Sequence, residues 1–345
     1  MIDRIRYPFD VAPETGAVTQ VGEGIFWARL PLPMALDHVN SFILDDRAVS
    51  GGWCIVDPGM DTRACREIWE DLLRGPLAAW PVTRVVVTHH HPDHIGLAGW
   101  FMARGADLVT TRTSWLMARM LVLDEHPLPT PEALRFWRAA GMDPEIFASR
   151  QVARPFNFKD CVHPLPLGYV RISDGDTLTI GARHWRVRTG DGHAPEHATL
   201  WSDEDGIILG GDQLLPSISA NLGVHPTEPD ADPVAEWLVS CRRFQLEASS
   251  EHLVLPGHKL PFTGLPLRLR QMIENHEAAL VRLVTHLETP RTAGECFAPL
   301  FKRAITPAVY GLALAEAVAH LNYLRHTGQV ARTTDEAGQW IWIKS

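Results

Sequence analysis

The sequence predicts an α/β fold, because short apolar, β-branched runs alternate with longer segments of helical periodicity. A first group of strands is expected near 24–31, 39–45, 52–57 and 83–88, with helices at 61–73 and 95–104. A second group is expected near 107–111, 170–173, 177–180, 184–189, 198–203 and 206–210, followed by helices at 233–246 and 265–287. Two groups of strands with helices outside them are typical of layered α/β architectures. A further observation is that residues able to bind metal follow several of these strands.

The most informative of these positions is the hexapeptide HHHPDH at 89–94, directly after the apolar run 83–88. Alternate residues of an extended loop point the same way, so His89 and His91 can hold one ion as a pair. Asp93 and His94 lie at the start of the helix expected over 95–104 and are turned towards a different point. One short loop can therefore contribute to two neighbouring metal positions.

Three more ligand-type residues follow apolar runs and are flanked by glycine or proline, which can turn the backbone sharply. His193 follows the strand at 184–189, Asp212 ends the strand at 206–210, and His258 follows a strand that ends near Leu255. A catalytic metal site needs about three protein ligands and an open position. Together with the first loop, these residues supply enough ligands for two ions.

With these motifs in this order, the chain resembles the metallo-β-lactamase superfamily from about Gly24 to Phe262. The resemblance implies an αβ/βα sandwich with the metal-binding loops along one edge of the sheets. It also implies two sets of ligands and a carboxylate that bridges them. The first ion would be held by His89, His91 and His193, the second by Asp93, His94 and His258, and Asp212 would bridge the two.

The family's early structural aspartate matches Asp57. In that role Asp57 accepts a hydrogen bond from a ligand imidazole and fixes its tautomer. A simple strand-end turn before the helix at 61–73 is a compatible interpretation of the same residue.

Two divalent ions lower the pKa of a bridging water from ~15.7 towards ~7, which gives a nucleophile at neutral pH. Asp93 and Asp212 would be the catalytic carboxylates around that hydroxide. Histidine and carboxylate ligands without thiolate favour Zn²⁺, although iron or manganese also suits such a site. The sequence has no G-x-S-x-G motif, and none of its five cysteines lies in a recognisable nucleophile motif. We therefore expect a metal-dependent hydrolase.

The bridging Asp212 and the loop GHAPEH at 192–197, which is close to the G-H-T-P-G-H loop of glyoxalase-II-like proteins, indicate a thioester, ester or lactone substrate. Glu196 replaces a glycine of that loop. His197 and Lys259 are candidate contacts of a small acyl substrate, beside the more ordinary interpretations of a supporting and a solvated residue. The alternatives are a ribonuclease or phosphodiesterase with the same metals, an iron-dependent persulfide-type dioxygenase, and a binding protein without activity.

Two segments stand apart from the catalytic domain expected over 1–263. The helical insertion at about 113–163 suits either a lid over the metal site or an ordinary helical pair or dimer surface. Residues 264–345 read as three helices and a hairpin that turns at Asp335 to Gly338, which resembles a winged-helix appendage. This C-terminal domain holds 9 Lys and Arg against 7 Asp and Glu, so a structural or dimerising role is preferred to RNA binding.

Composition sets further limits. The net charge of −9 disfavours a broad nucleic-acid surface. No apolar stretch of about 20 residues is present, and the first residues lack the apolar run of a signal peptide. We therefore expect a cytoplasmic enzyme without a membrane partner, with a homodimer suggested by the insertion and the appendage. Histidines outside the motifs, such as His276, are expected to be surface or helix residues.

Overall fold

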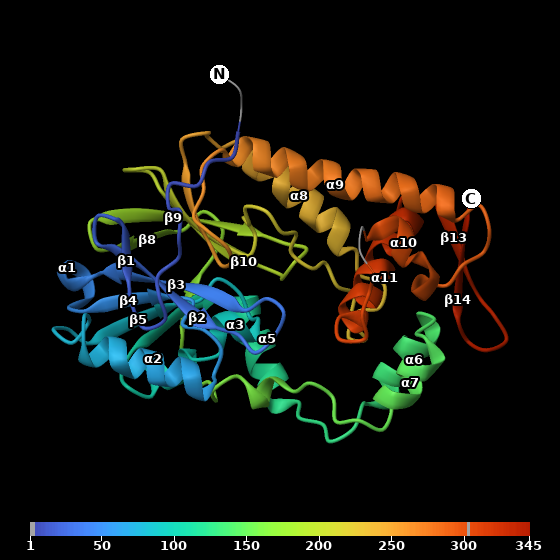
Figure 1. The fold of residues 1–345 in the computed structure, drawn as a ribbon, viewed down its shortest axis with the longest axis horizontal. Coiled ribbons are helices and arrows are strands. Elements are labelled where there is room, and N and C mark those ends of the chain that lie inside the picture. Colours follow the sequence, from blue (N-terminus) through green and yellow to red (C-terminus); the bar gives the residue numbers. More distant parts are fainter. Residues whose placement is uncertain (1–3, 302–303) are drawn as a thin grey trace. The chain divides into compact units, whose positions relative to one another are not determined.

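Two β-sheets dominate the computed structural model, which describes residues 4–301 and 304–345 (Figure 1). The first sheet has, in spatial order, β1 (Thr19–Gly22), β2 (Ile25–Pro31), β3 (His38–Asp45), β4 (Trp53–Val56), β5 (Val82–Val86), β6 (Asp107–Thr111) and β7 (Val170–Ile172). The second has β12 (Leu253–Pro256), β11 (Ile207–Gly211), β10 (His197–Ser202), β9 (Arg183–Gly190) and β8 (Thr177–Ile180). The expected strands are all present, and β1 is an addition.

The division of strands between the sheets differs from the prediction, which placed 107–111 and 170–173 in the second group. β6 instead pairs in parallel with β5, and β7 in parallel with β6. Both strands therefore extend the first sheet. The chain crosses to the second sheet only at β8. Strand pairing depends on long-range contacts, which the local pattern of a single strand does not encode.

The two sheets pack face to face through a buried apolar layer, as a sandwich requires. Trp27 and Phe42 of the first sheet and Trp185 and Leu200 of the second belong to this layer. The opposite face of the first sheet is covered by α2 (Arg63–Arg74), whose Trp69 is fully buried against it (Figure 1). Burying a large apolar side chain contributes about 1.5–3 kcal/mol, so these layers supply much of the stability of the fold.

The helix expected over 95–104 is two short helices, α3 (Pro92–Ile95) and α4 (Ala98–Met102). Pro92 starts α3, as its fixed φ allows at a first helical position. The break follows at Gly96 and Leu97, because the Leu97 N–H donates to the Gly59 carbonyl at 2.8 Å instead of continuing the helix. Asp93 and His94 thus lie within a helical turn and not ahead of one.

The chain divides into two compact units. Unit 1 contains the chain up to Glu125, residues 157–219 and residues 247–268, and holds both large sheets. Unit 2 contains residues 126–156, 220–246 and 269–345. This division differs from the predicted one, since 126–156 and 220–246 lie outside unit 1.

Hydrogen bonds within unit 2 explain the difference. The Asn322 amide donates to the carbonyls of Pro229 and Ala231 at 3.0 and 2.9 Å. The hydroxyl of Tyr310 accepts the Asp143 N–H at 2.9 Å. The predicted insertion is accordingly shared, with α5 (Arg112–Leu123) and η1 (Phe158–Asp160) in unit 1, and α6 (Pro131–Ala139) and α7 (Pro144–Arg150) in unit 2.

The C-terminal elements follow the predicted order of helix, short helix, long helix and hairpin. They are α9 (Leu265–His286), η2 (Ala293–Cys296), α10 (Phe297–Leu300), α11 (Tyr310–His326), β13 (Val330–Thr334) and β14 (Trp340–Lys344), preceded in the chain by α8 (Pro233–Gln245). The hairpin turns where expected, and the Asp335 N–H donates to the Gln339 carbonyl at 3.0 Å. The likeness of these elements to a winged helix remains a prediction.

The N-terminus of α5 is joined to the loop between β9 and β10. The Thr111 side chain accepts the Ser114 N–H, and the Glu196 carboxylate accepts the Thr113 N–H at 2.8 Å. Glu196 has a φ of 48°, in the left-handed region that favours glycine. Its own N–H donates to the Asp191 carboxylate at 2.8 Å. The residue that replaces the family's glycine therefore keeps the glycine-like backbone and adds a helix cap.

Two buried histidines stack in unit 2. The rings of His276 and His320 have centroids 5.3 Å apart, and His276 Nδ1 lies 3.1 Å from His320 Nε2. Because the Glu316 carbonyl accepts from His320 Nδ1, His320 Nε2 is the acceptor and His276 Nδ1 the donor. His276 lies in helix α9, which was one of the two expected positions, and at 2% exposure it is buried and not a surface residue.

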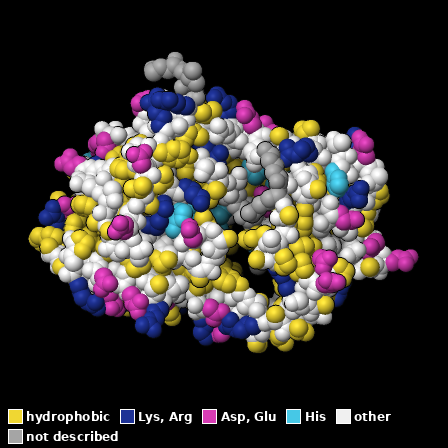
Figure 2. All heavy atoms as spheres, viewed as in Figure 1, with side chains coloured by type: hydrophobic (Ala, Val, Ile, Leu, Met, Phe, Trp, Pro, Cys, Tyr) yellow, Lys and Arg dark blue, Asp and Glu magenta, His cyan; other side chains and the backbone are white. Residues whose placement is uncertain are grey.

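On the face drawn in Figure 2, Lys and Arg side chains are dispersed among Asp and Glu and do not gather into one stripe. Among the described residues, every helix falls short of the length and apolar content that crossing a bilayer requires.

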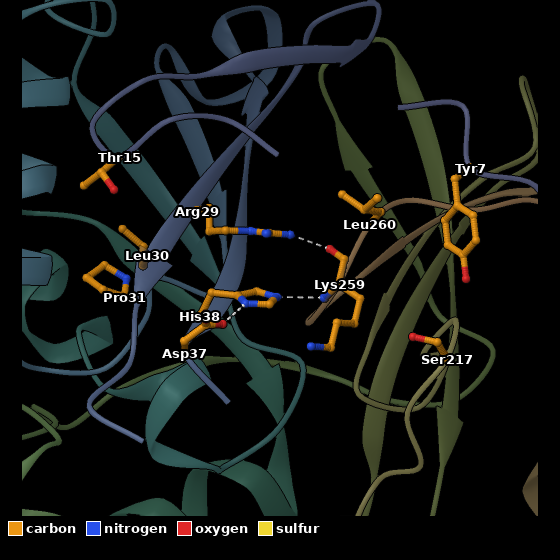
Figure 3. Close-up of a pocket in the computed structure, with 10 residues that line it drawn as sticks. All are labelled: Tyr7, Thr15, Arg29, Leu30, Pro31, Asp37, His38, Ser217, Lys259 and Leu260. Atoms are coloured by element: carbon orange, nitrogen blue, oxygen red, sulfur yellow. Dashed lines mark hydrogen bonds and ion pairs between the residues drawn. The ribbon is translucent and has the colours of Figure 1, made fainter. Parts of the chain in front are cut away.

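At one edge of unit 1, the turn after β12 is tied to β2 and β3. The Asn40 N–H donates to the Gly257 carbonyl at 2.7 Å, and the Asn40 amide donates to the Lys259 carbonyl at 2.9 Å. Arg29 donates to the same carbonyl at 2.7 Å, and the Lys259 N–H donates to His38 Nε2 at 2.9 Å (Figure 3). These bonds join the edges of the two sheets and hold the residues on either side of His258.

We predict that Glu196→Ala destabilises the protein more than Glu196→Gly does, by about 1 kcal/mol. Both changes remove the bond from the Thr113 N–H to Glu196 and leave the Thr111 cap in place, but only alanine carries a Cβ that is strained in the left-handed backbone. Urea unfolding of the two variants and the parent protein measures the difference. Equal stabilities of the two variants would contradict strain at this position.

We also predict that acid destabilises unit 2 through the stacked histidines. Burial lowers the pKa of His276 to about 3 and that of His320 to about 4. The unfolded chain, with a pKa near 6.5, then binds protons that the folded chain excludes, so stability falls as the pH drops from about 6.5 towards 4.

The expected loss is on the order of 1–2 kcal/mol per histidine at pH 5. Urea unfolding at pH 7.5 and pH 5 measures it, with His276→Phe/His320→Leu as the insensitive variant and the exposed His184→Gln as the control. An unchanged pH dependence in the double variant would show that other groups carry the effect.

Candidate metal centre

The candidate ligands all lie in unit 1, on loops that leave four strands at the same edge of the two sheets. Residues 89–94 follow β5, His193 lies between β9 and β10, Asp212 follows β11, and His258 follows β12. The structure brings all seven predicted ligands together in three overlapping groups, whose donor atoms lie within 4.8 Å of one another. The groups are His89–His91–His193, His89–His94–Asp212 and Asp93–His94–His258.

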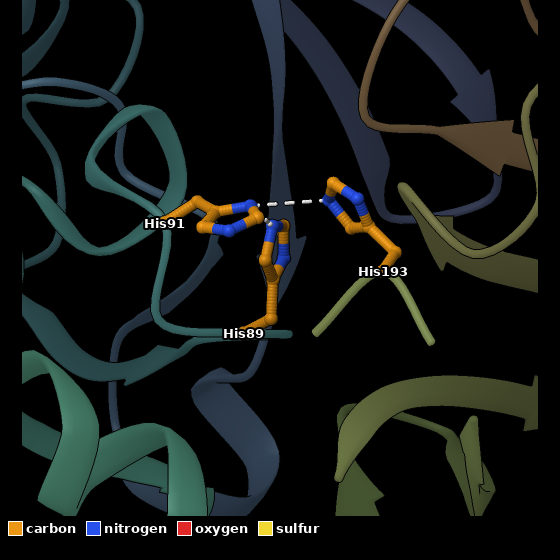
Figure 4. A group of neighbouring side chains, drawn as sticks. All are labelled: His89, His91 and His193. Atoms are coloured by element: carbon orange, nitrogen blue, oxygen red, sulfur yellow. Dashed lines mark hydrogen bonds between the residues drawn. The ribbon is translucent and has the colours of Figure 1, made fainter. Parts of the chain in front are cut away.

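The first group contains three histidine rings that face a common point (Figure 4). His89 Nε2 lies 2.9 Å from His91 Nδ1, which lies 3.1 Å from His193 Nε2. His89 and His91 meet because they alternate on the extended loop, as the sequence predicted. Three nitrogens at these separations are arranged to share one cation.

The tautomer of His89 is fixed by a hydrogen bond at its Nδ1, the ring nitrogen that does not face His91. The Thr88 hydroxyl donates to Asp57 Oδ2 at 2.8 Å, so its oxygen accepts from His89 Nδ1 at 3.0 Å. His89 Nε2 therefore carries the lone pair that faces His91. The Thr88 N–H donates to Asp57 Oδ1 at 2.8 Å and completes this chain of bonds.

Two ligand rings of the second set, His94 and His258, are held in the same way through their Nδ1 atoms. His94 Nδ1 donates to Asp57 Oδ2 at 2.8 Å, and His258 Nδ1 donates to the His38 carbonyl at 2.7 Å. Each ring thus turns its Nε2 to the centre, and this is the nitrogen that binds a metal once the ion displaces any proton on it. Asp57 makes the contact that the sequence predicted for it, and it has a φ of 55° that an aspartate tolerates better than most residues.

Asp212 lies between the two sets of histidines. Its Oδ2 is 3.5 Å from His193 Nε2 and 3.3 Å from His258 Nε2, while its Oδ1 is 3.4 Å from His94 Nε2. Asp93 Oδ2 is 3.4 Å from His258 Nε2 and 3.7 Å from His94 Nε2. One carboxylate therefore reaches both groups, and the other reaches only the second.

The backbone around Asp212 is crowded. Its N–H donates to His197 Nε2 at 3.0 Å, and the His197 ring stacks on His89 with centroids 4.5 Å apart. An added Cβ at Gly257 would lie 2.4 Å from Asp212 Oδ1, and one at Gly211 would lie 2.5 Å from His197 Cε1. Both positions therefore require glycine.

These residues fit divalent metal ions. Donors at about 2.1 Å from a tetrahedral ion lie about 3.4 Å from each other, and the separations here bracket that value. Among the described residues, neither His94 Nε2 nor Asp212 Oδ1 has a hydrogen-bond partner, although both are buried. Buried polar atoms without a partner are costly unless a ligand completes them.

The electrostatics of the centre also favour a cation. Burial opposes the charged form of His258, but Asp212 and Asp93 outweigh it and raise its pKa to about 10. Burial likewise opposes the charged form of Asp212, yet His258 and His94 lower its pKa well below the usual value. The carboxylates thus draw positive charge into the centre, and a bound ion would replace the proton.

The two candidate substrate contacts have different surroundings. His197 is fully buried, and burial with the neighbouring His193 lowers its pKa to about 3. Its bond to the Asp212 N–H makes it a support of that carboxylate, which was the alternative interpretation of this residue. Lys259 lines a pocket beside His258. Sequence reasoning missed Thr88 and His38, which act through a hydroxyl and a carbonyl and have no motif of their own.

Comparison with known proteins agrees with this geometry. The family model of the metallo-beta-lactamase superfamily matches residues 34–258, and that of the metallo-beta-lactamase-like C-terminal domain matches residues 280–345. The chain is similar to a probable metallo-hydrolase, YqjP, of Bacillus subtilis (strain 168), with 26% identity over 94% of this chain and 98% of that protein.

Two crystal structures are similar over nearly the whole chain. A beta-lactamase domain protein from Burkholderia ambifaria has 35% identity and a TM-score of 0.91, over 99% of this chain and 98% of that one. A metallo-beta-lactamase family protein from Thermus thermophilus has 27% identity and a TM-score of 0.78, over 94% and 100%. These matches confirm the predicted sandwich fold, and the chain belongs to the metallo-β-lactamase superfamily of metallo-hydrolases.

Proposed function

We propose that this protein is a binuclear metal-dependent hydrolase that acts on a thioester, ester or lactone. The observation that carries the proposal is the position of Asp212, whose two oxygens face different histidines. A carboxylate placed in this way can bridge two ions. All seven donors are present, which supports two ions over one. A non-catalytic binding protein that has lost its metal site would lack some of them.

We assign the ligands by donor atom. The first ion would be held by His89 Nε2, His91 Nδ1 and His193 Nε2. The second would be held by His94 Nε2, His258 Nε2 and a carboxylate oxygen of Asp93, and Asp212 would contribute to both. Nitrogen and oxygen donors without thiolate favour zinc, with iron or manganese as alternatives.

When bound, two such ions supply an acidic water and an electrophilic contact for the oxygen of the substrate's carbonyl group. The chain supplies orientation and charge. Burial opposes ionisation of Asp93, but His94 and His258 lower its pKa, so it remains a carboxylate able to accept a hydrogen bond from the attacking water. Asp57, His38 and His197 hold the ligand side chains, so little reorganisation is needed during the reaction.

An acyl substrate is preferred to RNA on grounds of charge. A nuclease of this kind needs a basic surface that follows the phosphate backbone. The chain carries a net charge of −9, and on the face in Figure 2 positive and negative side chains are mixed. Steep salt-dependent binding of RNA would overturn this preference.

We predict that Asp212→Ala and His89→Ala each lower turnover by about a hundredfold or more, because each removes a donor from the centre. Thiol release from a panel of acyl thioesters by the zinc-loaded protein measures turnover, and elemental analysis gives zinc bound per chain. His184→Ala, a change of an exposed histidine outside the centre, is the matched control. Undiminished turnover in either ligand variant would refute the ligand assignment.

We predict that Asp57→Asn weakens metal binding by about 10–100-fold while the fold is retained. The carboxylate of Asp57 accepts bonds from Thr88 and His94 at its two oxygens. The amide of asparagine has only one acceptor oxygen, so some of these bonds are lost. Competition with a chelator of known affinity measures the loss, and circular dichroism checks the fold. An unchanged affinity would mean that Asp57 serves only the turn after β4.

A further inference from the structure

A pocket of about 480 Å³ opens in unit 1 beside the metal-binding loops (Figure 3). Its wall includes Arg29, Asp37, His38 and Lys259. Lys259 follows His258 directly, and the rings of His38 and His258 have centroids 6.0 Å apart. A molecule in this pocket therefore lies next to a residue that we assign to the second ion.

The charged groups of the pocket differ in whether they already bind to other groups of the protein. Arg29 donates to the Lys259 carbonyl and to Asn40 Oδ1, so its donors are partly used within the protein. Asp37 is 2.6 Å from His38 Nδ1. The Lys259 ammonium, by contrast, forms no ion pair with any residue that the structure describes. The pocket thus has one excess positive charge, and the ammonium is open to a bound anion.

The backbone of Lys259 is held firmly in an unusual conformation. Its φ of 71° is rare for a residue with a long side chain, and such strain is retained mainly at functional sites. Its N–H donates to His38, and its carbonyl accepts from both Arg29 and Asn40. The side chain therefore leaves the backbone from a fixed point beside His258.

We propose that Lys259 binds a carboxylate of the substrate, a few bonds away from the acyl group that reacts at the metal centre. A singly charged group suits one free ammonium, whereas Asp37 on the same wall disfavours a doubly charged phosphate. Tyr7 and Ser217 also line the pocket and contribute hydroxyl groups to its wall. This inference rests on the proposed function and narrows its substrate to acyl compounds that carry a second, anionic end.

The test measures binding of product-like acids to the zinc-loaded protein by calorimetry, so it does not depend on turnover. Succinate, glutarate and adipate are compared with butyrate, pentanoate and hexanoate, which have the same chain lengths but one carboxylate. We expect at least one dicarboxylate to bind about tenfold or more tightly than its monocarboxylate. Lys259→Met should remove this preference and Lys259→Arg should restore most of it.

Lys159→Met is the matched control, because it removes the same charge from an exposed ion pair with Glu125. It should leave the preference unchanged. Equal binding of all dicarboxylates and monocarboxylates by the parent protein would overturn the inference, even if thioesters are hydrolysed. A preference for dicarboxylates that is lost in Lys259→Met would support the inference even if no thioester is turned over. In that case only the proposed reaction would fail.

Discussion

The metal centre depends on the buried carboxylate of Asp57. This side chain accepts from the Thr88 N–H, the Thr88 hydroxyl and His94 Nδ1, and through Thr88 it also orients His89. It therefore sets the tautomer of one ligand in each of the two groups. Without these bonds the rings could rotate or present a protonated nitrogen, and the donors would no longer converge.

The sheets determine where this convergence occurs. The loops that follow β5, β11 and β12 leave the sheets at one edge, so ligands more than a hundred residues apart in sequence meet there. Asn40 and Arg29 then bind the turn after β12 to the first sheet. The ligands therefore lie on short loops that are anchored at strand ends, and such loops position side chains more rigidly than free loops do.

Much of this could be predicted from the sequence, because ligand-type residues after apolar runs have a strong pattern. The placement of β6 and β7 in the first sheet could not be predicted, because it depends on pairing between strands that are distant in the sequence. The break between α3 and α4 escaped prediction because it depends on one hydrogen bond from Leu97 to Gly59. The cap that Glu196 places on α5 and the support that His197 gives to Asp212 likewise arise from tertiary contacts, which a local motif does not reveal.

The crowding at Gly211 and Gly257 limits how this centre can diversify. The backbone occupies the space directly behind Asp212, so any side chain at either position would displace the carboxylate or its support. Relatives with other metal preferences would therefore have to vary the donors themselves or the residues behind the imidazoles. The residue at position 259 can vary more freely. The Lys259 side chain is not among the atoms that crowd these two glycines, so a longer or shorter side chain at position 259 would leave the metal-binding donors in place and could change the substrate.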